Sequence, residues 1–187
     1  MKQTSSELDA RSVMQASRRA SRFDPQDTIL ARRSGQELID RLALLEIVPE
    51  NILDLGCGAG IEAAMLSHRY PKAHVIGLDI CPVCFQQEKF TPWAPLVGDA
   101  AALPLSMGTF DLVFANLVVP WCEPVTLFHE IARVLRPGGA IVISTLGPDT
   151  LKELRAAWET VDEHPHVHPF ADMHNLGDAL LQAGFLE

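Results

Sequence analysis

Three glycines alternate with small residues in the segment Gly56-Cys57-Gly58-Ala59-Gly60, directly after an apolar run at residues 52–55. Because glycine has no Cβ, such a loop can turn sharply and let its backbone approach a ligand closely. Asp79 stands 19 residues beyond Gly60, near the spacing at which an acid binds ribose hydroxyls in nucleotide-binding folds. The segment therefore predicts a site for a cofactor that contains a nucleoside.

The charge of nearby residues distinguishes between the two kinds of cofactor that fit this loop, a dinucleotide and a cationic nucleoside. The sequence Gly58-Ala59-Gly60-Ile61-Glu62-Ala63 matches the Gly-x-Gly-x-x-Ala pattern of dinucleotide-binding folds. A pyrophosphate at a helix N-terminus needs positive potential, whereas Asp54 precedes the glycines and Glu62 falls in the expected first helical turn. These carboxylates suit S-adenosylmethionine (SAM), which carries a sulfonium and an α-ammonium group. We therefore expect SAM as the cofactor.

Three polar residues at the ends of later segments extend this site. Asp79 can accept hydrogen bonds from both ribose hydroxyls, with a helix-capping role as the alternative. Asp99 can accept from the adenine amine or form a turn beside Gly98, and Asn116 either lies in the ligand crevice or is a strand-end turn residue. The predicted cofactor-binding residues are Asp54, Gly56, Cys57, Gly58, Gly60, Asp79, Ile80, Asp99, Ala100, Asn116 and Leu117.

Segments with strand character alternate with segments of helical periodicity along the chain. We expect strands at residues 52–55, 74–79, 96–97, 110–116 and 140–146, and helices at 26–45, 61–70, 82–89, 125–135, 149–159 and 175–183. This alternation predicts an α/β fold, a doubly wound, mostly parallel Rossmann-like sheet with right-handed crossovers. Such sheets bind ligands at the carboxyl ends of their strands, where the residues named above lie.

Composition limits the classes of protein that the chain can represent. Its 187 residues support one domain, and 48% hydrophobic against 21% charged residues predicts a folded core. The apolar stretches are much shorter than a membrane span, the first residues lack the apolar core of a secretory signal, and four scattered cysteines argue against a disulfide framework. We therefore expect a cytoplasmic protein without membrane contact. The net charge of −9 disfavours nucleic acid as a partner.

Two further patterns resemble functional motifs, but we assign them no function. Four histidines lie between residues 164 and 174, with no cysteine or carboxylate at structural-zinc spacing, so no metal site is predicted. The segment Cys81-Pro82-Val83-Cys84 has redox-motif spacing, but it follows the second expected strand instead of opening a thioredoxin-like domain. A redox role is therefore not expected.

Residues 1–45 differ from the rest of the chain in charge, and we interpret them as a helical arm beside a domain that spans residues 46–187. Residues 1–46 carry eight basic and seven acidic side chains, a charge of +1, so the remainder carries −10. Arg18, Arg19 and Arg22 are spaced to share one helix face. That face is either a solvated surface or a docking patch for an acidic partner.

A series of motifs occurs in a fixed order along about residues 46–146. It consists of the loop at residues 54–60, Asp79, Gly98-Asp99, Thr109-Phe110-Asp111-Leu112-Val113 and Leu135-Arg136-Pro137-Gly138-Gly139. This series resembles that of the class I SAM-dependent methyltransferases. The resemblance implies a doubly wound sheet that closes with an antiparallel last strand. Because the chain stops at Glu187, before such strands, we expect the domain to be incomplete at its C-terminus.

Two other segments narrow the expected substrate. Residues 115–122 and 145–158, with the continuation to Phe170, resemble the BioC-like malonyl-acyl-carrier-protein O-methyltransferases of biotin synthesis. This resemblance implies transfer of a methyl group to the free carboxylate of a malonyl thioester on acyl-carrier protein. An ionised carboxylate is already a nucleophile, so the reaction needs alignment and desolvation more than a base. No catalytic residue is therefore predicted.

Trp121 and Arg155 are the predicted substrate residues. Trp121 is expected to line a dry pocket, with a core tryptophan as the alternative. Arg155 or an arginine of the arm is expected to hold the malonyl thioester or the acidic carrier protein, with an ordinary surface arginine as the alternative. Two other functions stay open: methylation of another small molecule, and the hydroxylase or assembly role of a related branch of SAM-binding proteins of the respiratory-complex type. The oligomeric state is not predicted.

Overall fold

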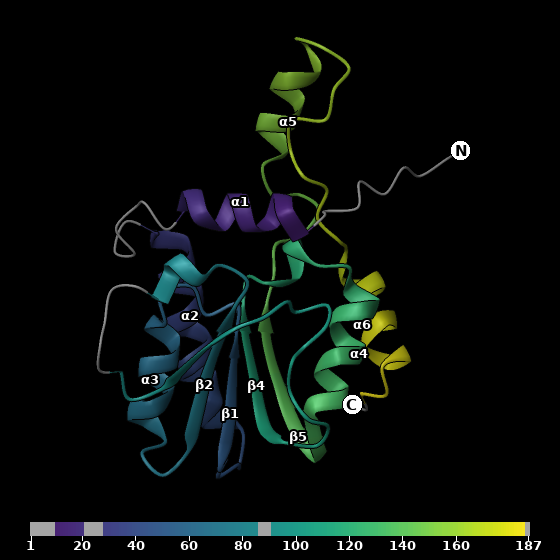
Figure 1. The fold of residues 1–187 in the computed structure, drawn as a ribbon. Coiled ribbons are helices and arrows are strands. Elements are labelled where there is room, and N and C mark those ends of the chain that lie inside the picture. Colours follow the sequence, from purple (N-terminus) through teal and green to yellow (C-terminus); the bar gives the residue numbers. More distant parts are fainter. Residues whose placement is uncertain (1–9, 21–27, 86–90, 186–187) are drawn as a thin grey trace.

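The computed structural model describes residues 10–20, 28–85 and 91–185, which form one sheet with helices on both faces (Figure 1). Arg22 and the second half of the helix expected at 82–89 lie outside the described residues. No helix within the described ranges is long and apolar enough to span a membrane.

Five parallel strands form the sheet, in the order β3-β2-β1-β4-β5. They are β1 (Asn51–Leu55), β2 (His74–Asp79), β3 (Ala94–Val97), β4 (Phe110–Asn116) and β5 (Leu135–Ser144). The chain runs outward from β1 to β3 and then returns to place β4 beside β1. The switch point between β1 and β4 is where α/β sheets of this kind bind ligands. The predicted fold class is therefore confirmed.

Helices cover the two faces of the sheet (Figure 1). One face packs against α2 (Ile29–Arg41), the 3₁₀ turn η2 (Leu42–Leu44) and α3 (Ile61–Arg69), and the other packs against α4 (Pro124–Val134) and α6 (Met173–Gln182). Along β4, Leu112 and Phe114 join the first core, whereas Val113 and Ala115 join the second. Alternate side chains of a strand point to opposite faces, so a strand covered on both faces is apolar over most of its length.

Several elements begin or end away from their expected positions, among them the following three. β5 starts at Leu135, because Leu135 pairs with Phe110 and the next pair is Leu112 with Ala140, which leaves residues 136–139 as a bulge. α5 (Lys152–Glu159) starts after Leu151, whose φ of +59° interrupts the expected helix. The described part of the expected helix at 82–89 is the 3₁₀ turn η3 (Pro82–Phe85).

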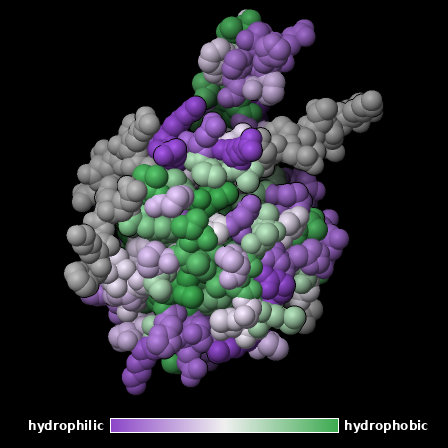
Figure 2. Space-filling view, viewed as in Figure 1, coloured by the Kyte–Doolittle hydropathy of each residue, from purple (hydrophilic) through white to green (hydrophobic). Residues whose placement is uncertain are grey.

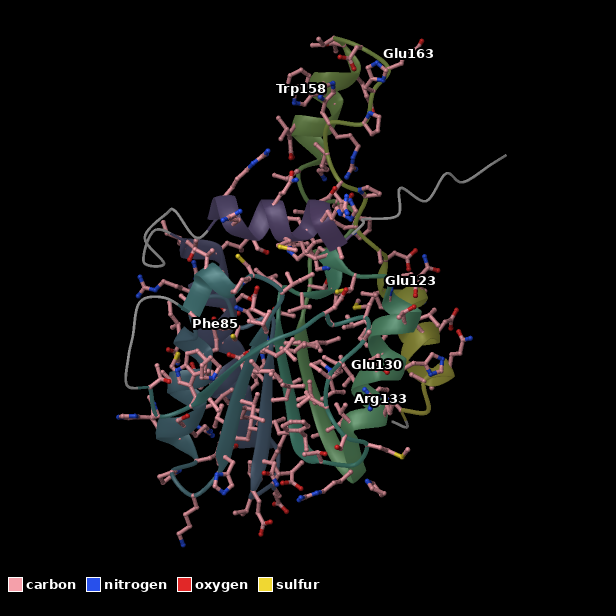
Figure 3. All side chains as sticks on the ribbon, viewed as in Figure 1. Phe85, Glu123, Glu130, Arg133, Trp158 and Glu163 are labelled. Carbon is pink, nitrogen blue, oxygen red and sulfur yellow. The ribbon has the colours of Figure 1, made fainter. Side chains whose placement is uncertain are left out.

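Two helical segments lie beyond the carboxyl ends of the strands. α1 (Ala10–Ala20) crosses this edge of the sheet and contacts η3 (Figure 1). α5 projects from the body beyond α1 and has no buried residue. In Figure 3, Trp158 and Glu163 mark this projecting segment. Both helices therefore lie at the end of the sheet where ligands are expected.

Candidate cofactor site

The loop between β1 and α3 contains three glycines in the left-handed region. Gly56, Gly58 and Gly60 have φ values of +68°, +52° and +80°, where only glycine is free of a steric penalty. A Cβ on Gly56 would collide with Val118 and one on Gly60 would collide with the Trp93 ring, whereas one on Gly58 would meet nothing within 4 Å. Gly58 therefore combines a left-handed backbone with open space, as expected where a ligand approaches the chain.

Backbone donors and Asp79 hold this loop against the end of β2. The N–H groups of Gly56 and Cys57 donate to the Leu78 carbonyl at 2.7 and 3.1 Å. Asp79 accepts from the Gly58 N–H at 3.0 Å through Oδ2 and from the Cys81 N–H at 2.8 Å through Oδ1. Each carboxylate oxygen can accept a further hydrogen bond. The ribose-binding role of Asp79 stays a prediction, and its bond to the Cys81 N–H, just before η3, is the local contact that the alternative helix-capping role would make.

Asp54, Glu62 and Asp79 form a group of carboxylates at the base of the loop. Asp54 is 1% exposed, and burial, followed by the charge of nearby Glu62, raises its pKa well above the usual value. Its Oδ2 has no hydrogen-bond partner among the described residues. Burial also raises the pKa of Glu62 and of Asp79, although their hydrogen bonds partly oppose the shift. A nearby cation would favour the ionised forms, so these residues fit a positively charged cofactor.

Asn116 ends β4, and its side chain joins three other elements. Its Nδ2 donates to the Ala31 carbonyl of α2 at 2.9 Å and to Glu62 Oε1 of α3 at 3.0 Å. Its Oδ1 accepts from Ser34 Oγ of α2 at 2.8 Å and from Ser144 Oγ of β5 at 2.7 Å. Both amide hydrogens and both lone pairs of the carboxamide oxygen are therefore used. This geometry makes Asn116 a residue that positions Glu62 and α2, and the cofactor contact predicted from the sequence would require one of these bonds to break.

Asp99 follows β3 and lies near the segment after β4. Its Oδ1 accepts from the Ala101 N–H at 2.9 Å, which is the turn considered as its alternative role. Burial and then the charge of Asp99 raise the pKa of Cys122 to about 12. The predicted neighbours Ile80 and Ala100 are half-buried. The ends of β1, β2, β3 and β4 thus bring the predicted cofactor residues to one edge.

Leu117 and Trp121 follow β4 at this edge. Leu117 has a φ of +58°, an unfavourable conformation for leucine, and its N–H donates to Ser144 Oγ at 3.0 Å. Trp121 ends the 3₁₀ turn η4 (Val119–Trp121) and is 48% exposed. It is therefore not a core tryptophan, and it stands at the carboxyl end of β4, where a substrate pocket is expected.

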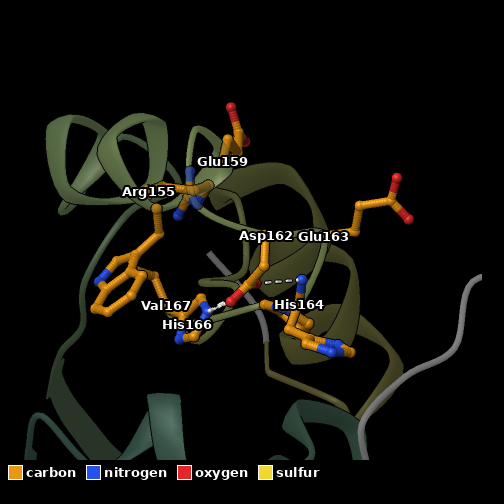
Figure 4. A pocket seen from close by; sticks show the side chains of 9 residues that line it. Arg155, Glu159, Asp162, Glu163, His164, His166 and Val167 are labelled. Carbon is orange, nitrogen blue, oxygen red and sulfur yellow. Dashed lines mark hydrogen bonds and ion pairs between the residues drawn. The ribbon is translucent and has the colours of Figure 1, made fainter.

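Arg155 lies apart from this edge, on the projecting α5 (Figure 1). Its Nη1 donates to the Pro148 carbonyl at 3.3 Å. It lines a cavity of about 360 Å³ together with Trp158, Asp162 and His166 (Figure 4). The two predicted substrate residues thus lie on different segments. Among the described residues, no group of three or more His, Cys, Asp or Glu side chains is arranged to hold a metal ion.

Trp93, Ser34 and Ser144 shape the site but were not identified from the sequence. Trp93 is buried and packs against Gly60 and Gly77. Gly35 lies so close to Glu62 Oε1 that a Cβ would collide with it. The Ser-Gly pair at 34–35 inside a helical pattern is a signal of such close approach. No comparable signal marks Trp93, which precedes a short edge strand, or Ser144.

Comparison with known sequences gives a consistent result. A family model described as "Methyltransferase domain" matches residues 53–143. The chain is 40% identical over 193 residues to the malonyl-[acyl-carrier protein] O-methyltransferase of Gallionella capsiferriformans, with 96% of this chain and 66% of that protein covered. It is 42% identical over 159 residues to the Legionella pneumophila protein of the same name, with 82% and 56% covered. The chain thus spans roughly three fifths of the length of these relatives.

Solved structures of low sequence identity share the fold. A complex between Haloferax volcanii Trm112 and a methyltransferase has a TM-score of 0.70 at 20% identity, covering 94% of this chain and 76% of that chain. Haemonchus contortus phosphoethanolamine N-methyltransferase 2, solved with SAM, has a TM-score of 0.65 at 20% identity, covering 83% and 37%. The family match, the relatives and these structures identify SAM as the cofactor. The chain belongs to the class I SAM-dependent methyltransferases, and its curated relatives include malonyl-[acyl-carrier protein] O-methyltransferases at 34–42% identity.

Proposed function

We propose that this protein transfers the methyl group of SAM to the free carboxylate of a malonyl group carried by an acyl-carrier protein, in the synthesis of the pimeloyl part of biotin. The observation that carries the proposal is the 40% identity to the Gallionella enzyme over 96% of the chain. This alignment is much longer than the glycine loop that many SAM-binding proteins share. It therefore supports the substrate as well as the cofactor.

The cofactor residues proposed are those that meet at the carboxyl ends of β1 to β4. Asp54 and Glu62 supply negative charge for a cationic ligand, and the open backbone at Gly58 allows close approach. We assign the ribose hydroxyls to Asp79 and the adenine amine to Asp99. When bound, SAM supplies an electrophilic methyl group on its sulfonium.

The acceptor chemistry explains why the protein needs no catalytic base. A malonyl carboxylate is ionised near neutral pH and attacks directly, so the protein has to align it and exclude water. Opposite charges cancel during the transfer, which a dry, apolar wall favours. The half-exposed Trp121 after β4 is our candidate for that wall. The role of Arg155 in substrate binding, the division at residues 45 and 46 and the cytoplasmic location stay predictions.

Mass spectrometry of malonyl-acyl-carrier protein after incubation with the protein and SAM tests the proposal. The expected result is the added mass of one methyl group, abolished when S-adenosylhomocysteine is in excess. Acetyl-acyl-carrier protein is the matched control, because it lacks the free carboxylate and should keep its mass. An unchanged malonyl-carrier mass in the presence of bound SAM would contradict the proposal. Methylation of another small molecule, or hydroxylation of a partner protein, would then identify one of the alternatives.

A further inference from the structure

The two faces of α1 differ in chemistry. Val13, Ala16 and Ser17 are partly buried, whereas Arg11, Arg18 and Arg19 are exposed. An α-helix turns by about 100° per residue, which places the three arginines on one side and the partly buried residues on the opposite side. The helix therefore packs on the body through small and apolar side chains and directs its arginines outward.

The position of α1 gives this basic face a functional context. The helix lies across the carboxyl-end edge of the sheet and contacts η3, which follows the predicted ribose acid Asp79 (Figure 1). It contains three arginines and no acidic residue, in a chain whose net charge is −9. Figure 2 shows strongly hydrophilic side chains over this helix. A basic surface thus borders the edge where the reaction is proposed to occur.

The cavity beside Arg155 has the opposite balance of charge. Glu159, Asp162 and Glu163 share its lining with Arg155 (Figure 4). Asp162 Oδ1 accepts from the His164 N–H at 2.8 Å and lies 2.9 Å from His166 Nε2, so the carboxylate is used within the loop. Three carboxylates around one guanidinium repel an acidic protein. The cavity is therefore a poor landing site for such a partner.

We propose that the outer face of α1, defined by Arg11, Arg18 and Arg19, is the docking surface for the acidic carrier protein that presents the malonyl thioester. This inference rests on the proposed function for the identity of the partner. Docking there places the carrier beside the carboxyl ends of β1 to β4, so that a thioester arm can reach the cofactor edge. Attraction of this kind accelerates encounter and weakens as salt screens it.

The test compares two double charge reversals of equal net charge. Arg11→Glu with Arg19→Glu alters the α1 face, and Arg41→Glu with Lys72→Glu alters exposed positions near the opposite end of the sheet. We expect the α1 variant to weaken binding of malonyl-acyl-carrier protein by about 10-fold or more at low salt and to flatten its salt dependence. SAM affinity and methylation of malonyl-pantetheine, which has no carrier, should stay at the wild-type level.

Three outcomes separate this inference from the proposed function. Equal weakening of carrier binding by the two double variants would overturn the docking surface, as would a larger loss in Arg155→Glu than in the α1 variant. If neither malonyl thioester is methylated by the wild-type protein, the proposed function fails. The titration of carrier binding still decides the docking surface in that case, because it does not depend on turnover.

Discussion

Acidic side chains at the two ends of the sheet differ in the direction of their pKa shifts and in whether they have ion-pair partners. At the carboxyl end, burial raises the pKa of Asp54, Glu62 and Asp79. The ion pairs found among the described residues involve none of these three. Within the described part of the chain, the charges at this end are therefore held without a partner cation.

At the amino end, both carboxylate oxygens of Asp111 have partners. Its Oδ1 lies 2.6 Å from Arg136 Nη1, and its Oδ2 accepts from the N–H groups of Glu50 and Asn51 at 2.8 Å each. Partial burial alone would raise the pKa of Asp111, but these backbone hydrogen bonds and Arg136 together lower it. Asp111 thus fastens the start of β4 to the start of β1 and to the bulge of β5.

Glu130 and Arg133 on α4 form another ion pair, away from both ends of the sheet (Figure 3). Arg133 donates to Glu130 and to the carbonyls of Leu103 and Leu105, and the Arg133 guanidinium lowers the pKa of Glu130. A buried carboxylate costs free energy unless it is paired. Asp54, Glu62 and Asp79 have no ion-pair partner among the described residues, which supports our proposal that they meet the cation of a ligand, whereas the paired acids stabilise the fold.

The largest expected effect compares two glycines. Gly58 and Gly138 both have positive φ and open space where a Cβ would lie, but only Gly58 is at the cofactor edge. Gly58→Ala and Gly138→Ala should each lower the free energy of unfolding by about 1 kcal/mol, because alanine disfavours this region. Gly58→Ala should also weaken SAM binding by about 100-fold, because an added methyl group costs about 2–3 kcal/mol in a closely packed contact.

Isothermal titration with SAM and thermal unfolding of both variants measure these effects. Gly138→Ala is the control, and its SAM affinity should match that of the wild type. Equal SAM affinity of the two variants would show that the ligand does not approach the chain at Gly58.

Removing the charge at each end should have opposite consequences. Asp54→Asn should raise the free energy of unfolding by about 1 kcal/mol near pH 8, because it removes a buried charge without a partner. It should also weaken SAM binding by about 10-fold or more, as expected for a lost charge-assisted contact. Asp111→Asn should lower the free energy of unfolding by about 1–2 kcal/mol and leave SAM affinity unchanged. Denaturant unfolding and calorimetry report both quantities, and a loss of stability in Asp54→Asn would refute the proposed contrast.

The sequence predicted the elements that carry local signals. The glycines at 56, 58 and 60, the run of apolar residues in β4 and the acid at the end of β2 have recognisable spacing, and the structure places them as expected. These features depend on residues close together in the chain, where periodicity and backbone preference decide the conformation.

The role of Asn116 depends on contacts that spacing does not encode. Its hydrogen-bond partner Ser34 stands 82 residues away, on a helix whose packing over the edge is not visible in a strand-and-helix pattern. The start of β5 differs from its expected position for a similar reason, because pairing of Leu135 with Phe110 overrides the turn signal of Pro137-Gly138-Gly139. The features that the sequence did not predict are therefore those that depend on contacts between residues far apart in the chain.

The pH dependence of SAM binding sharpens the comparison further. For Asp54, a raised pKa means that the folded protein binds more protons than the unfolded chain at pH values between about 3.8 and the raised pKa. Its contribution therefore makes stability fall as pH rises through that window. A cation favours the ionised group, so SAM should bind more tightly as pH rises, by up to about 10-fold per unit for each proton released. Calorimetry in buffers of different ionisation enthalpy measures that release, which should shrink in Asp54→Asn and persist in Asp111→Asn. Binding without proton release would mean that these carboxylates do not meet the cation.

The smallest effect is expected at Asp172, an acid that caps a helix. Its Oδ1 accepts from the N–H groups of His174 and Asn175 at 2.8 and 3.0 Å, at the start of α6. Asp172→Ala should lower the free energy of unfolding by about 1 kcal/mol, whereas Asp172→Asn should retain most of the cap. Because α6 covers the sheet face opposite α2 and α3, SAM affinity should stay unchanged in both variants. If SAM affinity fell together with stability, the acids that stabilise the fold would be coupled to the acids of the proposed cofactor site. That result would refute the contrast between the two groups.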